Sequence, residues 1–199
     1  MADIEKLRHT LESNGFQTSY FASAEECCAY MEQSLSGRTI GFGGSQTVRD
    51  MGLYERLSLR NTCIWHWDKT NNTIPADATN AQVYICSLNG VAETGELVNI
   101  DGGGNRVASG LFGHEKVYFI IGVNKIVPDL HAAIHRARNI AGPKNARRLG
   151  KKTPCAVNGD RCYDCHSPER ICAAMVIYWQ KPALIPEAEI VLVGEELGF

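Results

Sequence analysis

Short apolar runs, separated by stretches of mixed polarity, set the pattern of hydrophobic and polar positions along this chain. Short runs rich in Val and Ile are typical of strands that a sheet buries on both faces. We therefore predict strands at residues 16–22, 39–42, 63–65, 83–88, 97–100, 117–123, 175–179 and 190–193.

The stretches between these runs carry helical signals. Ile4, Leu7 and Leu11 recur at helical spacing and Gly15 follows as a stop, while Ser23 with Glu26 forms a capping box. Helices are predicted over residues 2–14, after Ser23, over 47–59, and from Pro128 with the apolar stripe Leu130, Ile134, Ala137 and Ala141. Strands that alternate with helices favour an α/β fold with a mostly parallel sheet and flanking helices.

Size and composition narrow the class of protein. The chain has 199 residues, 44% of them apolar, which predicts one domain over residues 1–199 and excludes a disordered chain. A formal net charge of −2 argues against a nucleic-acid coat. The apolar run at 117–123 is far shorter than the ~18 residues that span a bilayer. Because the first residues contain no apolar signal core, we expect a cytoplasmic protein.

A glycine-rich turn, Gly41-Phe42-Gly43-Gly44-Ser45-Gln46-Thr47, joins a predicted strand to a predicted helix. Glycines let backbone N–H groups approach a ligand closely, and a helix N-terminus favours anions. The turn is neither a P-loop nor a dinucleotide-binding fingerprint, because no Gly-Lys-Ser/Thr follows and Gln occupies position 46. A small anion is expected to bind here; an ordinary strand–helix turn is the alternative. The candidate residues are Gly43, Gly44, Ser45, Gln46 and Thr47.

A second glycine-rich stretch lies between Asn89 and Val107 and contains Asp101-Gly102-Gly103-Gly104-Asn105-Arg106. Three consecutive glycines weaken any regular element, and the polar residues around them supply an acceptor, an amide and a cationic fork. We expect a second wall of the same pocket, with a solvated hairpin as the alternative. The candidate residues are Glu93, which lies in a predicted turn, Asp101, Gly103, Gly104, Asn105 and Arg106.

The eight cysteines fall into two groups. Cys27, Cys28, Cys63 and Cys86 have apolar neighbours. The other four fall within a span of 18 residues, inside a loop-like, Cys-rich segment at 150–172. These four are Cys155, Cys162, Cys165 and Cys172, spaced C-x6-C-x2-C-x6-C. Four thiolates can bind one Zn²⁺ ion, with Zn–S distances of about 2.3 Å. They can also bind a [4Fe–4S] cluster, although the close cysteine spacing of ferredoxins is absent here. Unrelated reduced thiols, or thiols that pair only on oxidation, are the alternatives.

A basic stretch with no acidic residue precedes the cysteines, between residues 136 and 152. Its cations are Arg136, Arg138, Lys144, Arg147, Arg148, Lys151 and Lys152. They would either offset an anionic metal centre or line the route to an anionic ligand; the alternative is a solvated helix face. No triad order or nucleophile elbow is present, so the sequence assigns no catalytic residue.

Several segments together resemble the lactate-utilisation, or LUD-domain, family. They are GFGGSQTVRDMGL (41–53), LNGVAETGELVNIDGGGNRVASGLFG (88–113), IGVNKIV (121–127), ARNIAGPKNARRLGKKTPC (137–155), CYDCHSPERIC (162–172) and IVLVGEELGF (190–199). The resemblance implies a fold of the NagB/RpiA/CoA-transferase group. It also implies a component of lactate oxidation to pyruvate that works with iron–sulfur partner proteins.

Three functional hypotheses follow. The first is an organic-acid utilisation component, an oxidoreductase subunit if it is catalytic, that binds a small anionic metabolite and a cysteine-ligated metal or cluster. Because no flavin or nicotinamide fingerprint is present, a partner would supply the hydride acceptor. The second is a transferase or isomerase acting on a sugar phosphate or an acyl-CoA, with Glu93 or Asp101 as base or nucleophile. The third is a non-catalytic ligand sensor with structural zinc. A homo-oligomer is compatible with all three.

Overall fold

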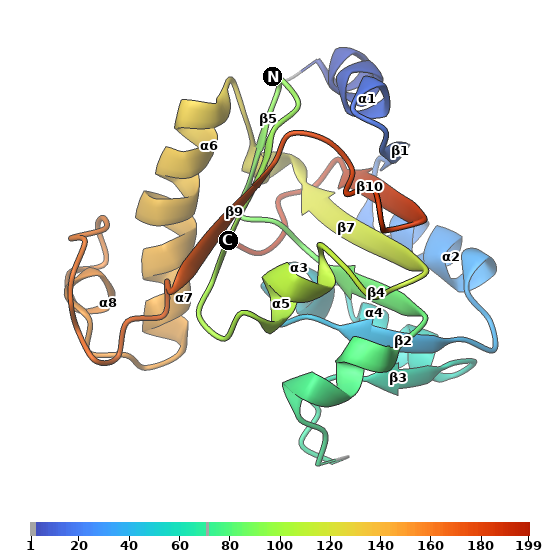
Figure 1. The fold of residues 1–199 in the computed structure, drawn as a ribbon, viewed down its shortest axis with the longest axis horizontal. Coiled ribbons are helices and arrows are strands. Elements are labelled where there is room, and N and C mark those ends of the chain that lie inside the picture. Colours follow the sequence, from blue (N-terminus) through green and yellow to red (C-terminus); the bar gives the residue numbers. More distant parts are fainter. Residues whose placement is uncertain (1–2, 71) are drawn as a thin grey trace.

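Six parallel strands form the central sheet in the computed structural model, which describes residues 3–70 and 72–199. The strand order is β1-β10-β7-β4-β2-β3 (Figure 1). Their bounds are β1 Gln17–Phe21, β2 Thr39–Phe42, β3 Thr62–Ile64, β4 Val83–Cys86, β7 Lys116–Gly122 and β10 Glu187–Val193. The predicted α/β architecture with a mostly parallel sheet is confirmed, whereas the relation to the NagB/RpiA/CoA-transferase group stays a prediction.

Strand β7 shows why the apolar runs are continuous. Tyr118 and Ile120 belong to the core on one face of the sheet, whereas Val117, Phe119 and Ile121 belong to the core on the other. Successive side chains of a strand point to opposite faces. Because both faces of the central sheet are covered, neither set can be polar, and the strand is apolar from Val117 to Ile121.

One face of the central sheet is covered by α2 Ala24–Ser34, α3 Gln46–Asp50 and α4 Leu53–Ser58. The other face packs against α1 Ile4–Ser13 and η1 Pro75–Asn80. The helical region predicted over residues 47–59 is divided into two helices, because Gly52 adopts φ +64° and separates α3 from α4. Of the helix predicted over residues 2–14, residue 2 lies outside the described residues.

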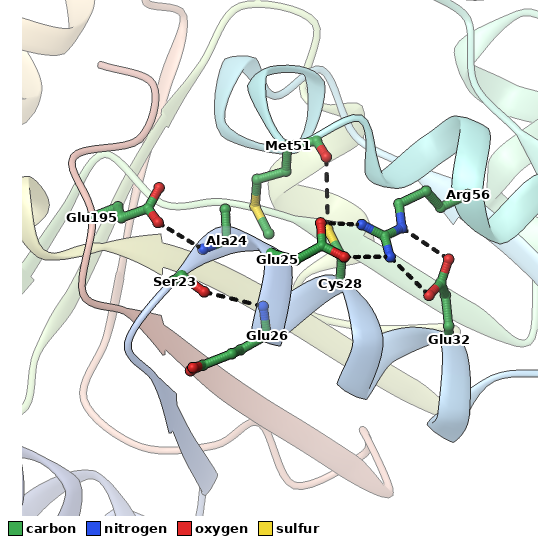
Figure 2. Close-up of polar contacts among 9 residues, drawn as sticks. All are labelled: Ser23, Ala24, Glu25, Glu26, Cys28, Glu32, Met51, Arg56 and Glu195. Carbon is green, nitrogen blue, oxygen red and sulfur yellow. Dashed lines mark hydrogen bonds and ion pairs between the residues drawn. The ribbon is translucent and has the colours of Figure 1, made fainter.

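Helix α2 begins at the predicted cap residue, Ser23, but the reciprocal bond of the capping box is made to the N–H of Ala22 instead of that of Ser23. Ser23 Oγ accepts a hydrogen bond from the N–H of Glu26 at 3.2 Å, and Glu26 Oε2 accepts one from the N–H of Ala22 at 2.9 Å. A carboxylate oxygen of Glu195 also accepts from the N–H of Ala24 at 3.1 Å (Figure 2). The first turn of α2 therefore has partners for N–H groups that no helix can satisfy internally.

Arg56 on α4 lies between two glutamates of α2 (Figure 2). Its Nη1 is 2.6 Å from Glu25 Oε2, and its Nε is 2.8 Å from Glu32 Oε1. Glu25 is largely exposed, so the solvent weakens this attraction. The pairs fix the position of α4 along α2, and the apolar contacts beneath supply most of the stability.

A smaller sheet packs against the central one, in the order β8-β5-β6-β9. Its strands are β5 Gly90–Ala92, β6 Leu97–Asp101, β8 Ile126–Val127 and β9 Ala174–Tyr178. The run at 175–179 was expected to form a strand buried in the parallel sheet. Instead β9 pairs antiparallel with β6 at the edge of the smaller sheet, and its first residues are exposed.

A helical stretch covers the outer face of the smaller sheet (Figure 1). It consists of α6 Leu130–Arg136, the π-helical turn η3 Ala137–Ala141 and α7 Gly142–Arg148. The predicted start at Pro128 shifts, because Asp129 caps the helix by accepting from the N–H of Ala132 at 2.8 Å. Glycine at position 90 allows the close packing, since a Cβ there would lie 2.9 Å from the carbonyl oxygen of Ala133.

Three short elements complete the fold: α5 Asn105–Ser109, η2 Val123–Lys125 and α8 Pro154–Asn158. No helix in the described ranges combines the length and the apolar character that crossing a membrane requires. The carboxyl ends of β2, β4, β6 and β7 lead into the loops that form the site.

Candidate functional site

A cleft of about 490 Å³ opens beyond the carboxyl ends of three central strands. The loops after β2 and β4 contribute Ser45 and Ser87, and η2 after β7 contributes Lys125. The end of β6 and the start of α5 contribute Asp101 and Arg106. In open α/β sheets, ligands commonly bind at this end of the strands. We call this cavity the cleft.

The first glycine loop forms one wall. Gly44, Ser45 and Gln46 line the cleft, whereas Gly43 and Thr47 lie behind them. Ser45 caps α3 by accepting from the N–H of Val48 at 3.3 Å. Because α3 has only five residues, we attribute the attraction for an anion to side-chain cations instead of to this helix.

The second glycine loop forms the facing wall. Asp101 Oδ1 and Oδ2 accept from the N–H groups of Gly102 and Arg106, each at 3.0 Å. The Arg106 guanidinium donates to the carbonyl oxygen of Ile100 at 2.5 Å and to that of Ser87 at 3.4 Å. The loop residues that line the cleft are Asp101, Gly102, Gly103, Asn105 and Arg106.

Two candidates of the second stretch lie elsewhere. Gly104, at φ +82°, caps α5 without lining the cleft. Glu93 lies in the predicted turn, at the end of the β5–β6 hairpin opposite Asp101, where Gly95 approaches Asn14, the residue that follows α1. The structure thus separates Glu93 from the other candidate residues.

Lys125 is a cleft residue that no sequence pattern indicated. Its side chain lines the cleft at only 3% exposure, and its Nζ donates to Thr47 Oγ1 at 2.7 Å and to Ser87 Oγ at 2.9 Å. An ammonium group has three N–H donors, so one remains for a ligand. The available signal was its position: the first cation after the long buried strand β7.

Burial of the amine, with the charges of Arg136 and Arg106 nearby, lowers the pKa of Lys125 to about 7. An anion bound in the cleft would oppose this effect, because it favours the ammonium form. Lys125 therefore gains both a partner and a proton when a ligand carries negative charge into the cleft.

The basic stretch before the cysteines divides between several roles. Arg148 and Lys151 line the cleft, and the Arg148 guanidinium lies over the ring of Trp67 at 4.5 Å. Arg136, in contrast, is buried and donates to three backbone carbonyls. Arg138 lines a second cavity, described below.

Two polar atoms at the cleft lack partners among the described residues, Gln46 Oε1 and His66 Nδ1. Gln46 Oε1 can only accept a hydrogen bond. Burial lowers the pKa of His66, so its imidazole is neutral near pH 7 and can donate or accept. A ligand with a hydroxyl or an oxo group beside its negative charge would satisfy such atoms.

The four clustered cysteines line a second cavity of about 280 Å³, which we call the cysteine cavity. It adjoins the cleft, and six residues line both: Ile100, Ala137, Gly142, Arg170, Ile171 and Cys172. Within residues 3–70 and 72–199, no three His, Cys, Asp or Glu side chains are grouped so that they could hold one metal ion.

The charges of the cleft favour an anion. Five cationic and two anionic side chains line it: Arg106, Lys125, Arg148, Lys151 and Arg170 against Asp101 and Glu169. Low-dielectric walls strengthen this imbalance relative to an open surface. The cleft can therefore hold a small anion between two loops, with polar atoms left to read its other groups.

Comparisons with known proteins identify the fold and the family. A crystal structure of a DUF162-family protein from Deinococcus radiodurans has a TM-score of 0.54 to this chain. The alignment covers 96% of this chain and 95% of that one at 11% identity, which shows the fold alone. No curated protein matches the sequence significantly. The sequence profile of the LUD domain matches residues 4–193, and the chain belongs to the LUD-domain family.

Proposed function

We propose that this protein binds a small organic-acid anion in the cleft, as a component of the utilisation of lactate or a related 2-hydroxy or 2-oxo acid. One observation carries the proposal: three basic side chains from different elements, Arg106, Lys125 and Arg148, line one cleft between the two glycine loops. Membership of the LUD-domain family supports the substrate class.

The polar atoms without partners favour a hydroxy acid over a simple carboxylate. A carboxylate group would take the remaining N–H of Lys125 and the outer face of a guanidinium. A hydroxyl at carbon 2 would donate to an acceptor such as Gln46 Oε1, which is buried without a partner. In a 2-oxo acid, the oxo group would instead accept from neutral His66.

We also propose which proteins act together with this chain. Iron–sulfur proteins of a lactate-oxidation system are the partners that the family resemblance implies. The site of this chain contributes binding and orientation. A partner that carries a two-electron acceptor takes the hydride, and iron–sulfur clusters then pass the electrons on one at a time.

A transferase or isomerase is the alternative that the same cleft must be tested against. Glu93, one of its two proposed carboxylates, does not line the cleft. The other, Asp101, accepts hydrogen bonds from two backbone N–H groups, which favours a structural carboxylate. Both observations weigh against this alternative.

Calorimetric titration of the full chain tests the proposal, with lactate, pyruvate, ribose 5-phosphate and coenzyme A as probes. We expect lactate or pyruvate to bind, and Arg106→Gln to weaken the affinity by about 10- to 100-fold, because a hydrogen bond to a charged group contributes about 1.5–3 kcal/mol. Arg38→Gln is the control, because Arg38 pairs with Glu115 on the exposed surface. Binding of only ribose 5-phosphate or coenzyme A, or of no probe by folded protein, would contradict the proposal.

A further inference from the structure

Four cysteines that are spread over 18 residues converge on one cavity. The segment from residue 159 to 173, which carries three of them, forms no helix or strand. It wraps around the cavity, and Cys155 approaches from α8. The rest of the lining is largely apolar: Ile100, Ala137, Gly142, Pro143, Ile171, Ala173, Ala174 and Met175.

The sulfur atoms of this cavity meet hydrogen-bond donors. Arg170 Nε lies 3.1 Å from Cys172 Sγ, and the N–H of Asp164 lies 3.4 Å from Cys162 Sγ. Thr153 Oγ1 lies 3.3 Å from Cys155 Sγ. Each of these three sulfur atoms therefore has a polar group within hydrogen-bond reach in an otherwise largely apolar cavity.

Two of the remaining cysteines form a contrast within the same chain. Cys27 and Cys86 are completely buried in the apolar cores, and burial raises the pKa of each to about 12. These thiols stay neutral and pack as small apolar side chains. All four cysteines of the cysteine cavity are instead partly accessible.

The dimensions of the cysteine cavity favour an iron–sulfur cluster over a single metal ion. Zinc would require four sulfurs at about 2.3 Å from one point, and no such group exists among the described side chains. The volume of about 280 Å³ is many times the roughly 30 Å³ of one water molecule. A [4Fe–4S] cluster binds each thiolate to a different iron atom, so it needs sulfurs spread around a cavity.

The charges near the cavity suit an anionic cluster. Arg138 Nη2 lies 3.7 Å from Cys162 Sγ and 3.1 Å from Asp164 Oδ1. Arg170 Nη2 is 3.5 Å from the same carboxylate oxygen, and its Nη1 donates to the carbonyl oxygen of Cys165 at 2.9 Å. A [4Fe–4S] cluster with four thiolate ligands carries a net negative charge. The guanidinium groups of Arg138 and Arg170 lie close enough to the cysteines to offset that charge.

We propose that Cys155, Cys162, Cys165 and Cys172 bind one [4Fe–4S] cluster in the cysteine cavity. Its position adds a second element, which rests on the proposed function. Cys172 and Arg170 line both the cysteine cavity and the cleft, so a bound organic acid lies across a single layer of side chains from the cluster. The acid therefore changes the electronic environment of the cluster.

Anaerobic reconstitution of the full chain with ferric iron, sulfide and a thiol reductant tests the cluster. We expect about four irons and four sulfides per chain, and a broad visible absorption that bleaches with dithionite. Cys162→Ser and Cys172→Ser should each lose most of the bound iron. Cys63→Ser is the matched control. Cys63 is also partly accessible, but it lies on β3, where it packs against the core under α2, α3 and α4.

Three results would overturn the cluster. They are stoichiometric zinc that iron and sulfide cannot replace, disulfide bonds among the four cysteines in anaerobically purified protein, and unchanged iron binding in both serine variants. Circular dichroism of each variant shows whether it has folded, and a variant that fails is replaced by the corresponding alanine.

Paramagnetic resonance of the reduced protein tests the contact with the cleft. We expect lactate to shift the spectrum of the wild type and to leave that of Arg106→Gln unchanged. A cluster whose spectrum ignores bound lactate overturns the second element alone. Lactate binding to a chain that forms no cluster overturns the cluster and leaves the proposed function standing.

Discussion

The Nζ atom of Lys125 lies 2.7 Å from Thr47 Oγ1, and this contact joins two elements that are 78 positions apart in the chain. One is the turn after β7, and the other is the helix that follows the first glycine loop. The contact holds the Lys125 side chain next to the first glycine loop, whose Ser45 and Gln46 line the cleft. The loop and the lysine therefore act as one unit of the site.

Affinity for lactate should fall as the pH rises above 7. The pKa of Lys125 is lowered to about 7, and Arg136, Arg106, Asp50 and Cys86 are the charged or titratable groups around it. Since the bound anion favours the ammonium form, binding takes up a proton, and the affinity drops by up to about tenfold per pH unit. Calorimetry in buffers of different ionisation enthalpy measures that uptake.

Lys125→Met should weaken binding at pH 6 and flatten the dependence between pH 7 and 9. Lys6→Met is the control, because Lys6 is exposed on α1. A wild-type protein that binds lactate with no proton uptake at pH 7.5 would contradict this role of Lys125.

The same lysine makes stability depend on pH. Between pH 7 and about 10.5 the unfolded chain binds a proton that the folded chain does not, so the free energy of unfolding rises with pH. In Lys125→Met this contribution disappears, and urea unfolding at pH 7 and 9 should show a smaller rise than the wild type. An equal rise in both proteins would show that Lys125 is charged when buried.

Gly43→Ala should disturb the guanidinium of the cleft. An added Cβ would lie 2.8 Å from Tyr84 Oη and 3.0 Å from Arg106 Cγ, so one of these side chains must move. Overpacking of this kind costs about 1–3 kcal/mol in stability. We expect a lower unfolding midpoint in urea together with weaker lactate binding; unchanged affinity would show that Arg106 does not depend on this packing.

Much of the fold could be predicted from local pattern. The alternation on β7 explains why continuous apolar runs mark central strands, and the capping box at Ser23 marked the start of α2. The sheet that a strand joins depends on distant pairing instead. Met175 has the same local character as residues of the central strands, yet its strand pairs with β6 at an exposed edge.

The site divides in the same way. The two glycine loops carry local signals, because consecutive glycines and flanking polar residues stand out in the sequence. Lys125 does not stand out, since only the parallel sheet brings it next to Thr47 and Ser87. The adjacency of Cys172 to the cleft likewise depends on the smaller sheet, whose strand β9 leads away from the cysteine segment.

Arg136→Met should destabilise the protein. The Arg136 guanidinium, 5% exposed, donates to the carbonyl oxygens of Asn124 at 2.9 Å, Asn89 at 2.5 Å and Phe199 at 3.1 Å. Leaving these carbonyls without a donor costs about 3–5 kcal/mol in total. Urea unfolding measures the loss, and Arg38→Met, at an exposed pair, should lose less than about 1 kcal/mol. Equal losses would contradict the buried role.

Gly102→Ala should affect the cleft and the cysteine cavity together. A Cβ at position 102 would lie 2.6 Å from the carbonyl oxygen of Ile171, and backbone atoms cannot turn aside as a side chain can. The second glycine loop and the segment between Cys165 and Cys172 must then separate. We expect weaker lactate binding and less iron retained after anaerobic reconstitution, with a loss of about 1–3 kcal/mol in stability.

Gly103→Ala is the matched control for this change. The close atom there is Asn105 Oδ1 at 2.9 Å, the end of a side chain that can rotate away. Iron retention should therefore stay near the wild-type value in Gly103→Ala, since neither Gly103 nor Asn105 lines the cysteine cavity, and fall in Gly102→Ala. If Gly102→Ala lowers lactate affinity but retains all its iron, the two cavities are mechanically independent, and the contact at Ile171 serves the cleft alone.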